Sequence, residues 1–402
     1  MDYNFDQVID RSNTNAKKFE AYKEGVFHDS QIKLPFKDEE LIQFWIADME
    51  FAVAPEIKEA LEDRIAKKIF GYTVNNDTRL YDALSKWCKE RYDFTFQKDE
   101  LVLSNGVVDA LIKLVGYILK DDEKVLITSP SYSQFANAAK LNGKEFITSP
   151  LLKDDKGNYF LDFDDLDKKM ARDDVSLFIF CNPHNPTGRA WTNDELTKLK
   201  DLIEKYDIFV ISDEIHCDLR RKETIAHIPL GKVMPTYDKL VTCMSASKSF
   251  NIAGLAESCI IIRNKDLLKK WNFYNNNKVN PLSHEAIIAA YSKGGSWLKA
   301  LNAYLDKNFE FLYEFFDKNI SKAIVTKAET TYLAWVDFKE YFAYDENLEE
   351  FFAKEAGVII EADKAFVSDA NRMVRINLAC PKSYLETGLE KMAEALKNKI
   401  DQ

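Results

Sequence analysis

The sequence predicts an α/β protein with two domains, a large one built on a mostly parallel sheet flanked by helices and a smaller α+β one. Three observations lead to this fold class. A chain of 402 residues is too long for one ordinary hydrophobic core. From residue 101 onward, short apolar runs alternate with stretches of helical periodicity, which is typical of a parallel sheet covered on both faces. After residue 285 this alternation ends.

Two helices are expected before the alternating region. Residues 53–70 carry apolar side chains at helical spacing, and their proline suits a first helical turn. Residues 77–92 repeat the pattern, with Asp77 as the expected N-cap. The first 45 residues lack the alternation of strands and helices, and we expect them to pack on the smaller domain.

The alternating region contains six apolar runs that predict buried strands. They are residues 101–103, 125–128, 177–181, 208–212, 240–244 and 258–262. Helices are expected near residues 107–119, 132–141 and 193–206. In such sheets ligands collect beyond the carboxyl ends of the strands. The residues that follow these runs are therefore the first candidates for function.

The smaller domain is predicted from a change of pattern. Residues 282–318 are expected to be helical, and residues 332–338 and 373–378 to form strands. We assign residues 46–285 to the large domain and residues 1–45 and 286–402 to the small one. Since no Pro/Ser-rich linker separates them, we expect the two domains to be in firm contact.

Composition and charge exclude several classes of protein. The net charge is −11 and no basic stripe occurs, which argues against a nucleic-acid partner. No apolar run approaches the roughly 18–20 residues of a membrane span, and the N-terminus lacks the features of a secretory signal. The six cysteines are scattered without a Cys-x-x-Cys pair, so we expect them to fill the core of a cytoplasmic protein.

Lys248 and Asp213 are the first candidates for catalysis. Lys248 follows the run 240–244 within small and polar residues. A lysine forms a Schiff base with an aldehyde cofactor if its surroundings lower its pKa, although most lysines are surface charges. Asp213 ends the run 208–212, where a carboxylate can keep the ring nitrogen of pyridoxal phosphate (PLP) protonated. An N-cap or an ion pair is the alternative for Asp213.

Asn185 and His216 are candidates for the cofactor's ring hydroxyl. Asn185 lies in a Pro-flanked turn after the run 177–181, and turn formation alone also explains it. His216 lies three residues after Asp213 and can reach the same oxygen. A metal site is not expected, because His216 has no third ligand nearby in sequence. His284-Glu285 also lacks the second histidine of a metalloprotease helix.

The phosphate and the ring need further partners. Gly106 and Val107 follow a strand and open a helix, so their backbone forms an anion site at the helix N-terminus. Ser245 can add a hydroxyl. Tyr132 follows another strand, where its ring can stack on the pyridine; core packing is the alternative.

Arg375 lies in the apolar strand-like run 373–378. A buried arginine needs an anionic partner, either a substrate α-carboxylate bound through two hydrogen bonds or a structural Asp or Glu. An amide, a carboxylate, an amine and a guanidinium in this order along the chain predict a PLP enzyme that acts on amino acids.

With these residues in place, the chain resembles the fold-type I, aspartate-aminotransferase-like PLP enzymes. Within them it resembles the MalY/PatB group of cystathionine β-lyases, or C-S lyases. The motifs that favour this group are Ser247-Lys248-Ser249-Phe250-Asn251-Ile252 and Ser212-Asp213-Glu214-Ile215-His216. Further matching pieces are Ile46-Ala47-Asp48-Met49-Glu50-Phe51, Phe70-Gly71-Tyr72, Thr331-Tyr332-Leu333-Ala334-Trp335 and the run from Arg375 to Pro381. Ala256 stands where aminotransferases often carry a phosphate-binding arginine, and His216 where they often carry tyrosine.

The resemblance implies a role for each candidate. Lys248 is the Schiff-base lysine and Asp213 the partner of the ring nitrogen. The remaining cofactor contacts fall to Tyr132 on the ring, Asn185 on its oxygen, and Gly106, Val107 and Ser245 on the phosphate. Arg375, with Asn185, takes the substrate carboxylate. Tyr72 reaches the phosphate of a neighbouring subunit, so a homodimer is implied.

The implied reaction is an α,β-elimination. Lys248 removes the Cα proton, a thiolate leaves the β-carbon, and the released aminoacrylate hydrolyses to pyruvate and ammonia. With L-cystathionine the thiol is homocysteine, and other cysteine S-conjugates are further substrates. A PLP-dependent aminotransferase shares every step up to the carbanion and is the first alternative. A PLP-binding regulatory protein is the second. A nicotinamide dehydrogenase is excluded, because no Gly-x-Gly-x-x-Gly follows an early strand.

Overall fold

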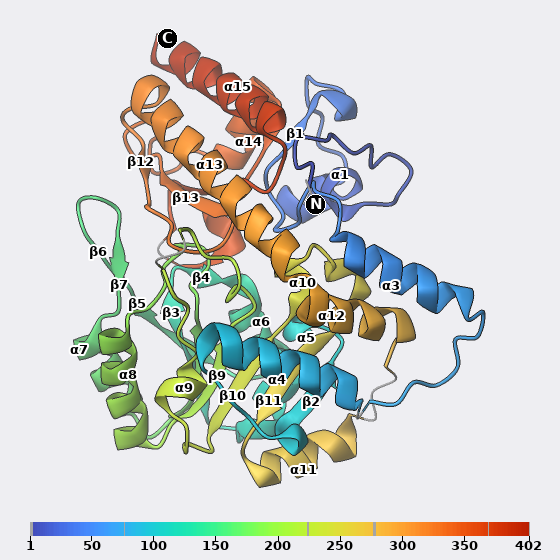
Figure 1. Ribbon diagram of the computed structural model, residues 1–402. Coiled ribbons are helices and arrows are strands. Elements are labelled where there is room, and N and C mark those ends of the chain that lie inside the picture. The colour runs from blue at the N-terminus through green and yellow to red at the C-terminus, as the bar shows by residue number, and fades with distance from the viewer. Residues whose placement is uncertain (1–2, 76, 223–224, 276–278, 369, 402) are drawn as a thin grey trace.

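The computed structural model describes residues 3–75, 77–222, 225–275, 279–368 and 370–401. Two sheets organise the chain, with the larger sheet in the lower half of Figure 1 and the smaller one above it, beside the C-terminal helices. The α/β class and the large, helix-flanked sheet are as predicted. The exact division at residues 46 and 286 stays a prediction.

The larger sheet has seven strands. In spatial order they are β2 (Leu101–Ser104), β11 (Ser258–Ile262), β10 (Leu240–Met244), β9 (Phe209–Asp213), β8 (Val175–Cys181), β3 (Lys124–Ser129) and β5 (Phe146–Pro150). Strand β11 is antiparallel to both of its neighbours, and all other pairings are parallel. All six predicted strands are confirmed. The seventh, β5, was missed because it is a half-exposed edge strand without a continuous apolar run.

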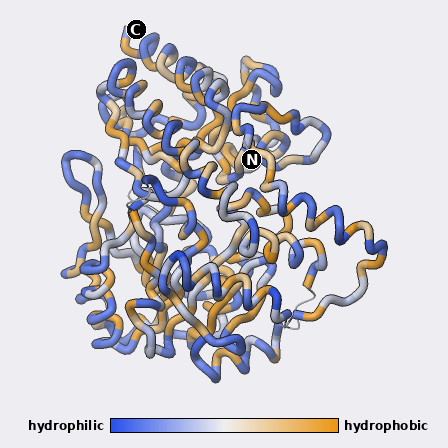
Figure 2. The backbone as a smooth tube through the Cα atoms, in the orientation of Figure 1, coloured by the Kyte–Doolittle hydropathy of each residue, from blue (hydrophilic) through white to orange (hydrophobic). Residues whose placement is uncertain are grey.

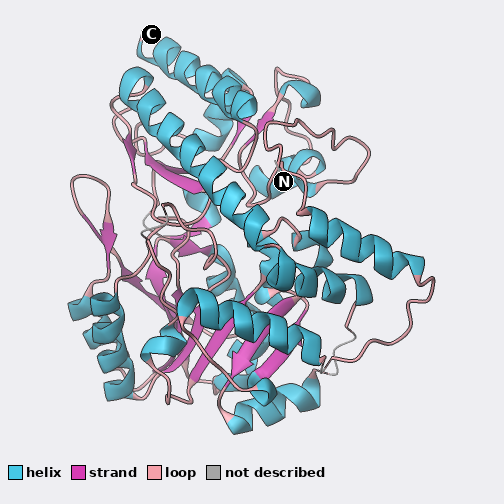
Figure 3. Cartoon of the chain, in the orientation of Figure 1, coloured by secondary structure: helices cyan, strands magenta, loops and turns pink. Residues whose placement is uncertain are grey.

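Helices cover both faces of this sheet (Figure 3). One face packs against α5 (Val107–Ile118), α6 (Ser133–Leu141) and α11 (Lys265–Tyr274). The other packs against α7 (Phe163–Met170), α8 (Asn193–Tyr206) and α9 (Leu230–Val233), and further along against α3 (Pro55–Ala66), α4 (Thr78–Tyr92) and α12 (Pro281–Lys293). Alternate strand residues pack against alternate faces of the sheet, so the inner strands carry apolar side chains on both faces. Along the outer helices, hydrophilic (blue) and hydrophobic (orange) residues alternate (Figure 2).

The helix boundaries follow local signals. Asp77 is the N-cap of α4, as predicted, and its side chain accepts a hydrogen bond from the backbone N–H of Arg79 at 2.8 Å. Helix α3 ends at Ala66, four residues before the predicted end, and Lys68 then adopts a φ of +64°. The predicted helix 282–318 is in fact two helices, α12 and α13 (Gly295–Asn319), with a break at Gly294. A Cβ on Gly294 would lie 2.4 Å from a ring atom of Phe250, so the close approach of this ring requires glycine.

The smaller sheet is antiparallel throughout. Its order is β12 (Ile324–Val325), β13 (Leu333–Asp337), β17 (Met373–Asn377) and β15 (Glu361–Ala362). The predicted strands 332–338 and 373–378 are therefore confirmed. Helices α13 and α15 (Lys382–Ile400) supply Phe316, Leu385 and Met392 to the core that covers this sheet.

The N-terminal segment contacts both halves of the molecule. Strand β1 (Ile42–Gln43) pairs in parallel with β14 (Val358–Ile359), which places it on the smaller unit as predicted. Phe5, however, packs against Phe51 and Trp297 in the core shared with α3, α4 and α12. The segment therefore also contacts the core of the larger unit, and its assignment to the smaller domain stays a prediction.

Short elements complete the fold. They are the helices α1 (Lys17–Glu20), α2 (Tyr22–Val26), α10 (Ala246–Ser249) and α14 (Leu348–Phe351), the turns of helix η1 (Asp38–Glu40), η2 (Lys98–Glu100), η3 (Ala253–Leu255), η4 (Phe352–Ala356) and η5 (Asp363–Ala365), and the strand pairs β4 (Ser131–Tyr132) with β16 (Phe366–Val367) and β6 (Leu152–Lys153) with β7 (Tyr159–Phe160). Within the described residues no helix is both long and apolar enough to cross a membrane. All six cysteines are buried and unpaired.

Candidate active site

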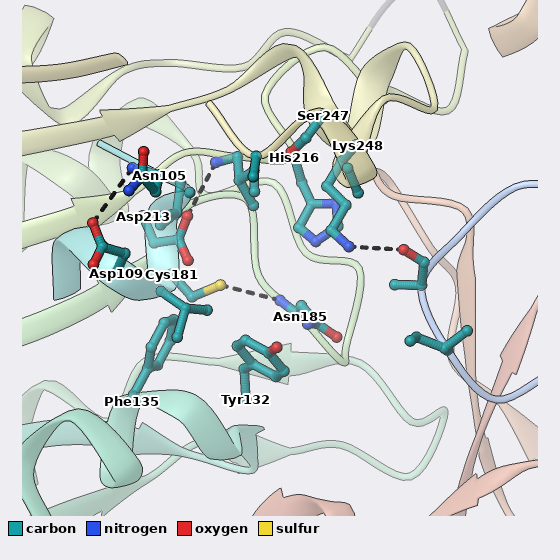
Figure 4. A pocket seen from close by; sticks show the side chains of 18 of the residues that line it. Asn105, Asp109, Tyr132, Phe135, Cys181, Asn185, Asp213, His216, Ser247 and Lys248 are labelled. Atoms are coloured by element: carbon teal, nitrogen blue, oxygen red, sulfur yellow. Dashed lines mark hydrogen bonds between the residues drawn. The ribbon is translucent and has the colours of Figure 1, made fainter. Parts of the chain in front are cut away.

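A pocket of about 280 Å³ opens at the carboxyl ends of β8 and β9, where the two halves of the chain meet. It brings together eight of the ten residues predicted from the sequence, namely Gly106, Val107, Tyr132, Asn185, Asp213, His216, Lys248 and Arg375. Figure 4 shows Lys248 and His216 on one side of the pocket and Tyr132 on the other, with Asn185 between them. The two predicted residues outside its lining are Ser245 and Tyr72.

Lys248 lies in the single turn of α10, directly after β10. Its Nζ donates a hydrogen bond to the backbone oxygen of Ala47 at 2.7 Å. Burial, together with the positive charge of Arg375, lowers the pKa of Lys248 to about 8. A substantial fraction of this amine is therefore neutral near physiological pH, which a nucleophile or general base requires.

Asp213 is the last residue of β9 and lies between Cys181 and Cys243 of the neighbouring strands. Only 5% of the residue is exposed. Burial raises the pKa of Asp213 to about 7, against the opposing effects of a hydrogen bond from the Ile215 N–H at 3.1 Å and of the charge on Lys248. A buried carboxylate of this kind is stabilised by a cationic partner on its pocket side.

His216 is buried beside Lys248, edge-on to the ring of Tyr332 at a centroid distance of 6.3 Å. Burial, then the charges of Lys248 and Arg375, lower the pKa of His216 to about 3, so the imidazole is neutral. Its Nδ1 is buried and has no hydrogen-bond partner among the described residues. The neutral ring therefore has an unused hydrogen-bonding atom within the site.

The N-terminus of α5 forms one end of the pocket. Gly106 is its N-cap and has a φ of +114°, a backbone conformation that side chains rarely allow. Val107 is the first helical residue, and the N–H groups of a first turn lack partners within their own helix. Together with the helix dipole they form an anion site.

The structure places Ser245 and Tyr72 differently from the other candidates. The hydroxyl of Ser245 donates to the backbone oxygen of Glu257 at 3.0 Å and accepts from the Ser247 N–H at 3.1 Å, and it is Ser247 that lines the pocket. Tyr72 is 95% exposed in the loop between α3 and α4, at the right of Figure 1.

Tyr132 lies across the pocket from Lys248, and Asn185 lies between them (Figure 4). Tyr132 ends β4, and burial raises the pKa of its hydroxyl to about 12, so the phenol stays neutral. The backbone N–H of Asn185 donates to Sγ of Cys181 at 3.4 Å. Its side-chain oxygen accepts from Nη1 of Arg375 at 3.2 Å.

Arg375 lies in the middle of β17 and is 3% exposed. Its Nη2 donates to the backbone oxygen of Trp45 at 3.1 Å and pairs with the carboxylate of Glu361, its neighbour on β15. Its Nε is buried without a partner among the described residues. The guanidinium therefore has a structural ion pair and also keeps a donor free. Sequence reasoning missed Glu361, since no motif marks it.

The segment from Ile46 to Phe51, which we call the bridging segment, contributes Ile46 and Ala47 to the lining of the pocket. The side-chain amide of Asn377 donates to the backbone oxygens of Ile46 and Asp48, both at 2.7 Å. That of Asn251 donates to Met49 and Phe51 at 3.1 and 2.8 Å. Sequence reasoning recognised these residues as motif pieces but gave them no role.

The functional groups of the pocket fit the cofactor that the sequence predicts, PLP, and an amino-acid substrate. An amine of lowered pKa, a buried carboxylate, a helix N-terminus and an arginine with a free donor match the aldehyde, the ring nitrogen, the phosphate and the substrate carboxylate respectively. The described residues contain no cluster of three His, Cys, Asp or Glu side chains arranged to hold a metal ion.

Comparison with known proteins places these features in context. The family described as aminotransferase class I and II matches residues 39–392. The cystathionine β-lyase PatB of Bacillus subtilis is 35% identical over 98% of this chain and its own full length. Protein MalY of Escherichia coli is 30% identical over 98% of this chain and 99% of its own. The crystal structure of the PLP-bound C-S lyase from Staphylococcus hominis is 46% identical, with a TM-score of 0.95 over 98% of both chains.

Proposed function

Because this chain belongs to the aminotransferase class I and II family, and is similar to lyases of that family over nearly its whole length, we propose that it is a PLP-dependent carbon–sulfur β-lyase. It cleaves L-cystathionine and other cysteine S-conjugates by α,β-elimination, and it releases a thiol, pyruvate and ammonia. The observation that carries this proposal is the meeting of Lys248, Asp213 and Arg375 in one pocket.

PLP supplies an aldehyde that condenses with amines and a ring that withdraws the negative charge developing at the substrate Cα. Asp213 holds the proton on the ring nitrogen, and the pair this forms relieves the cost of its buried charge. Lys248 leaves the Ala47 oxygen and takes the proton from Cα, a transfer for which its pKa of about 8 is suited.

The other residues bind and orient. Gly106 and Val107 hold the phosphate through backbone N–H groups, and Ser245 joins them when its hydroxyl turns from the Glu257 oxygen. Tyr132 stacks on the ring.

Three further side chains bind oxygen atoms of the substrate carboxylate and of the cofactor ring. Asn185 and the neutral His216 take the ring hydroxyl, the latter through its unpartnered Nδ1. Arg375 binds the substrate α-carboxylate, and its free Nε provides one of the two donors of a bidentate contact.

The first test uses visible absorption and product release. Purified protein should show the yellow absorption of a lysine-bound cofactor, and Lys248→Ala should lose or alter it. With L-cystathionine and no keto acid, wild type should release pyruvate and the variant should not. A yellow protein that releases no pyruvate would point to an aminotransferase or a regulatory protein. A protein that cannot bind PLP would refute the proposal.

We also propose a homodimer in which Tyr72 reaches the phosphate of the partner's site. Its 95% exposure and its place outside its own chain's pocket support this assignment. A mixture of Tyr72→Phe and Lys248→Ala proteins, unfolded and refolded together, should recover about a quarter of wild-type activity, because half of the dimers are mixed and have one intact site. No recovery would contradict a contribution across subunits. We further propose a cytoplasmic location, with which six unpaired cysteines agree.

A further inference from the structure

Glu361 is a charged group of the pocket to which the proposed function assigns no role. We propose that Glu361 binds an ammonium group on the leaving thiol, so that the enzyme favours cysteine S-conjugates whose thiol half carries a second amino group. This inference rests on the proposed lyase function and assigns a specificity-determining residue to it.

The other carboxylates of the pocket lining have partners of their own. Asp213 serves the ring nitrogen. Asp109 pairs with Lys113 at 2.7 Å and accepts a hydrogen bond from Ser104 at 2.5 Å. Glu257 contacts the ring of His284 at 3.1 Å.

Glu361 depends on cations that the working site needs elsewhere. It pairs with Arg375, and the charge of Lys248 also stabilises it, with a weaker contribution from Lys17, which is exposed to solvent. When Arg375 binds the substrate carboxylate and Lys248 engages the cofactor, two anions share one guanidinium. A carboxylate that is 18% exposed then has less than a full countercharge, which is costly in a buried position. A cation brought by the substrate removes this cost.

The position of Glu361 suits the outer part of a substrate. It lines both the active-site pocket and an adjoining cavity of about 710 Å³, together with Ile46, Tyr132 and Arg375. A substrate anchored at Arg375 can thus extend past Glu361 into the second cavity. That cavity also carries the exposed Lys17 and Lys140, which suit the carboxylate of an amino-acid tail.

The test compares conjugates that differ at the tail. S-aminopropyl-L-cysteine and S-propyl-L-cysteine have the same chain and differ in one ammonium group, and both release pyruvate on elimination. Wild type should favour the aminopropyl compound in kcat/KM by about tenfold or more, the size of a charge-assisted hydrogen bond. Glu361→Gln keeps the shape of the side chain, and it should lose most of this preference.

A matched control separates charge recognition from a general effect of breaking an ion pair. Glu195 pairs with the buried Arg189 at 2.9 Å, is 15% exposed in its side chain and lies outside the pocket. Glu195→Gln should keep the wild-type preference. An unchanged preference in Glu361→Gln would overturn the proposal and leave Glu361 as a structural partner of Arg375.

A binding measurement keeps this inference separate from the lyase proposal. Calorimetric titration of the Lys248→Ala protein with each conjugate reports affinity without turnover. The aminopropyl compound should bind about tenfold or more tightly, and Lys248→Ala/Glu361→Gln should abolish the difference. Absence of pyruvate from every conjugate would refute the lyase function alone. Equal affinities of the two conjugates for the Lys248→Ala protein would refute the role of Glu361. This result does not depend on whether Glu361→Gln folds.

Discussion

Replacement of Asp213 by asparagine should change how the stability of the cofactor-free protein depends on pH. Asparagine keeps the shape of the side chain and the oxygen that accepts from the Ile215 N–H. It removes only the titrating proton. Burial raises the pKa of Asp213 from 3.8 to about 7, so between these values the folded protein binds a proton that the unfolded chain releases. The favourable contribution of this proton is complete below pH 3.8 and is lost as the pH rises to about 7.

The magnitude follows from the shift in pKa. A difference of about three pKa units corresponds to about 4 kcal/mol over the whole window, of which about 3 kcal/mol falls between pH 5 and 8. Relative to Asp213→Asn, the free energy of unfolding of the wild type should therefore fall by about 3 kcal/mol from pH 5 to pH 8. Other titrating groups are common to both proteins and cancel in the difference.

Urea denaturation of cofactor-free proteins across this range measures the effect. Asp194→Asn is the control, because Asp194 is exposed in the first turn of α8 and its replacement should leave the pH dependence as in the wild type. Parallel curves for wild type and Asp213→Asn would refute the argument, since they would mean that the carboxylate is already stabilised without the cofactor. With PLP bound at pH 8, the wild type should have the higher free energy of unfolding, the reverse of the order for the cofactor-free proteins. The reason is that Asp213 then faces a cation, with which asparagine cannot form an ion pair.

Three further substitutions test the site. The added methyl group of Gly106→Ala would meet no atom within 4 Å, but it places a side chain at a φ of +114°. The substitution should therefore lower the free energy of unfolding by about 1–2 kcal/mol and weaken PLP binding, measured by absorption. Gly254→Ala has similar open space and no positive φ, so it should have neither effect. Asn251→Ala removes three hydrogen bonds to the bridging segment and should lower the free energy of unfolding in urea by about 2–3 kcal/mol, and a loss below about 0.5 kcal/mol would contradict this. His216→Ala should change the pH dependence of the cofactor's absorption, and an identical curve would exclude contact with the ring hydroxyl.

The sequence predicted the large sheet well because its strands are apolar on both faces. The apolar runs at residues 177–181 and 240–244 are continuous, and the observed strands β8 and β10 include all of these residues. Strand β5 was not predicted, because it lies at the edge of the sheet, is partly exposed and therefore does not need a continuous apolar run. The break between α12 and α13 was not predicted, because the periodicity continues through Gly294. The ring of Phe250, distant in sequence, leaves no room for a side chain at that position.

Those parts of the candidate site could be predicted in which a single residue, in a recognisable local sequence pattern, indicates a particular chemistry. Lys248 and Asp213 follow predicted strands, so the carboxyl edge of the sheet brings them together. Glu361 was not predictable in this way, because its partner lies on a neighbouring strand and the pairing register sets their contact. The hydroxyl of Ser245 also depends on tertiary structure, since its acceptor is a backbone oxygen twelve residues away.

The bridging segment explains how the two halves of the site stay aligned. Lys248 lies in α10, which follows a strand of the larger sheet, and Arg375 lies in the smaller sheet. Lys248 donates to Ala47 within the bridging segment, and Arg375 donates to Trp45, the residue just before it. Asn251 and Asn377 lie three and two residues after these side chains and hold that stretch from either side. Displacement of this stretch should therefore disturb the Lys248 amine and the Arg375 guanidinium together. Asn251 and Asn377 thus hold the backbone on which Lys248 and Arg375 both depend for a hydrogen bond or for the placement of its acceptor.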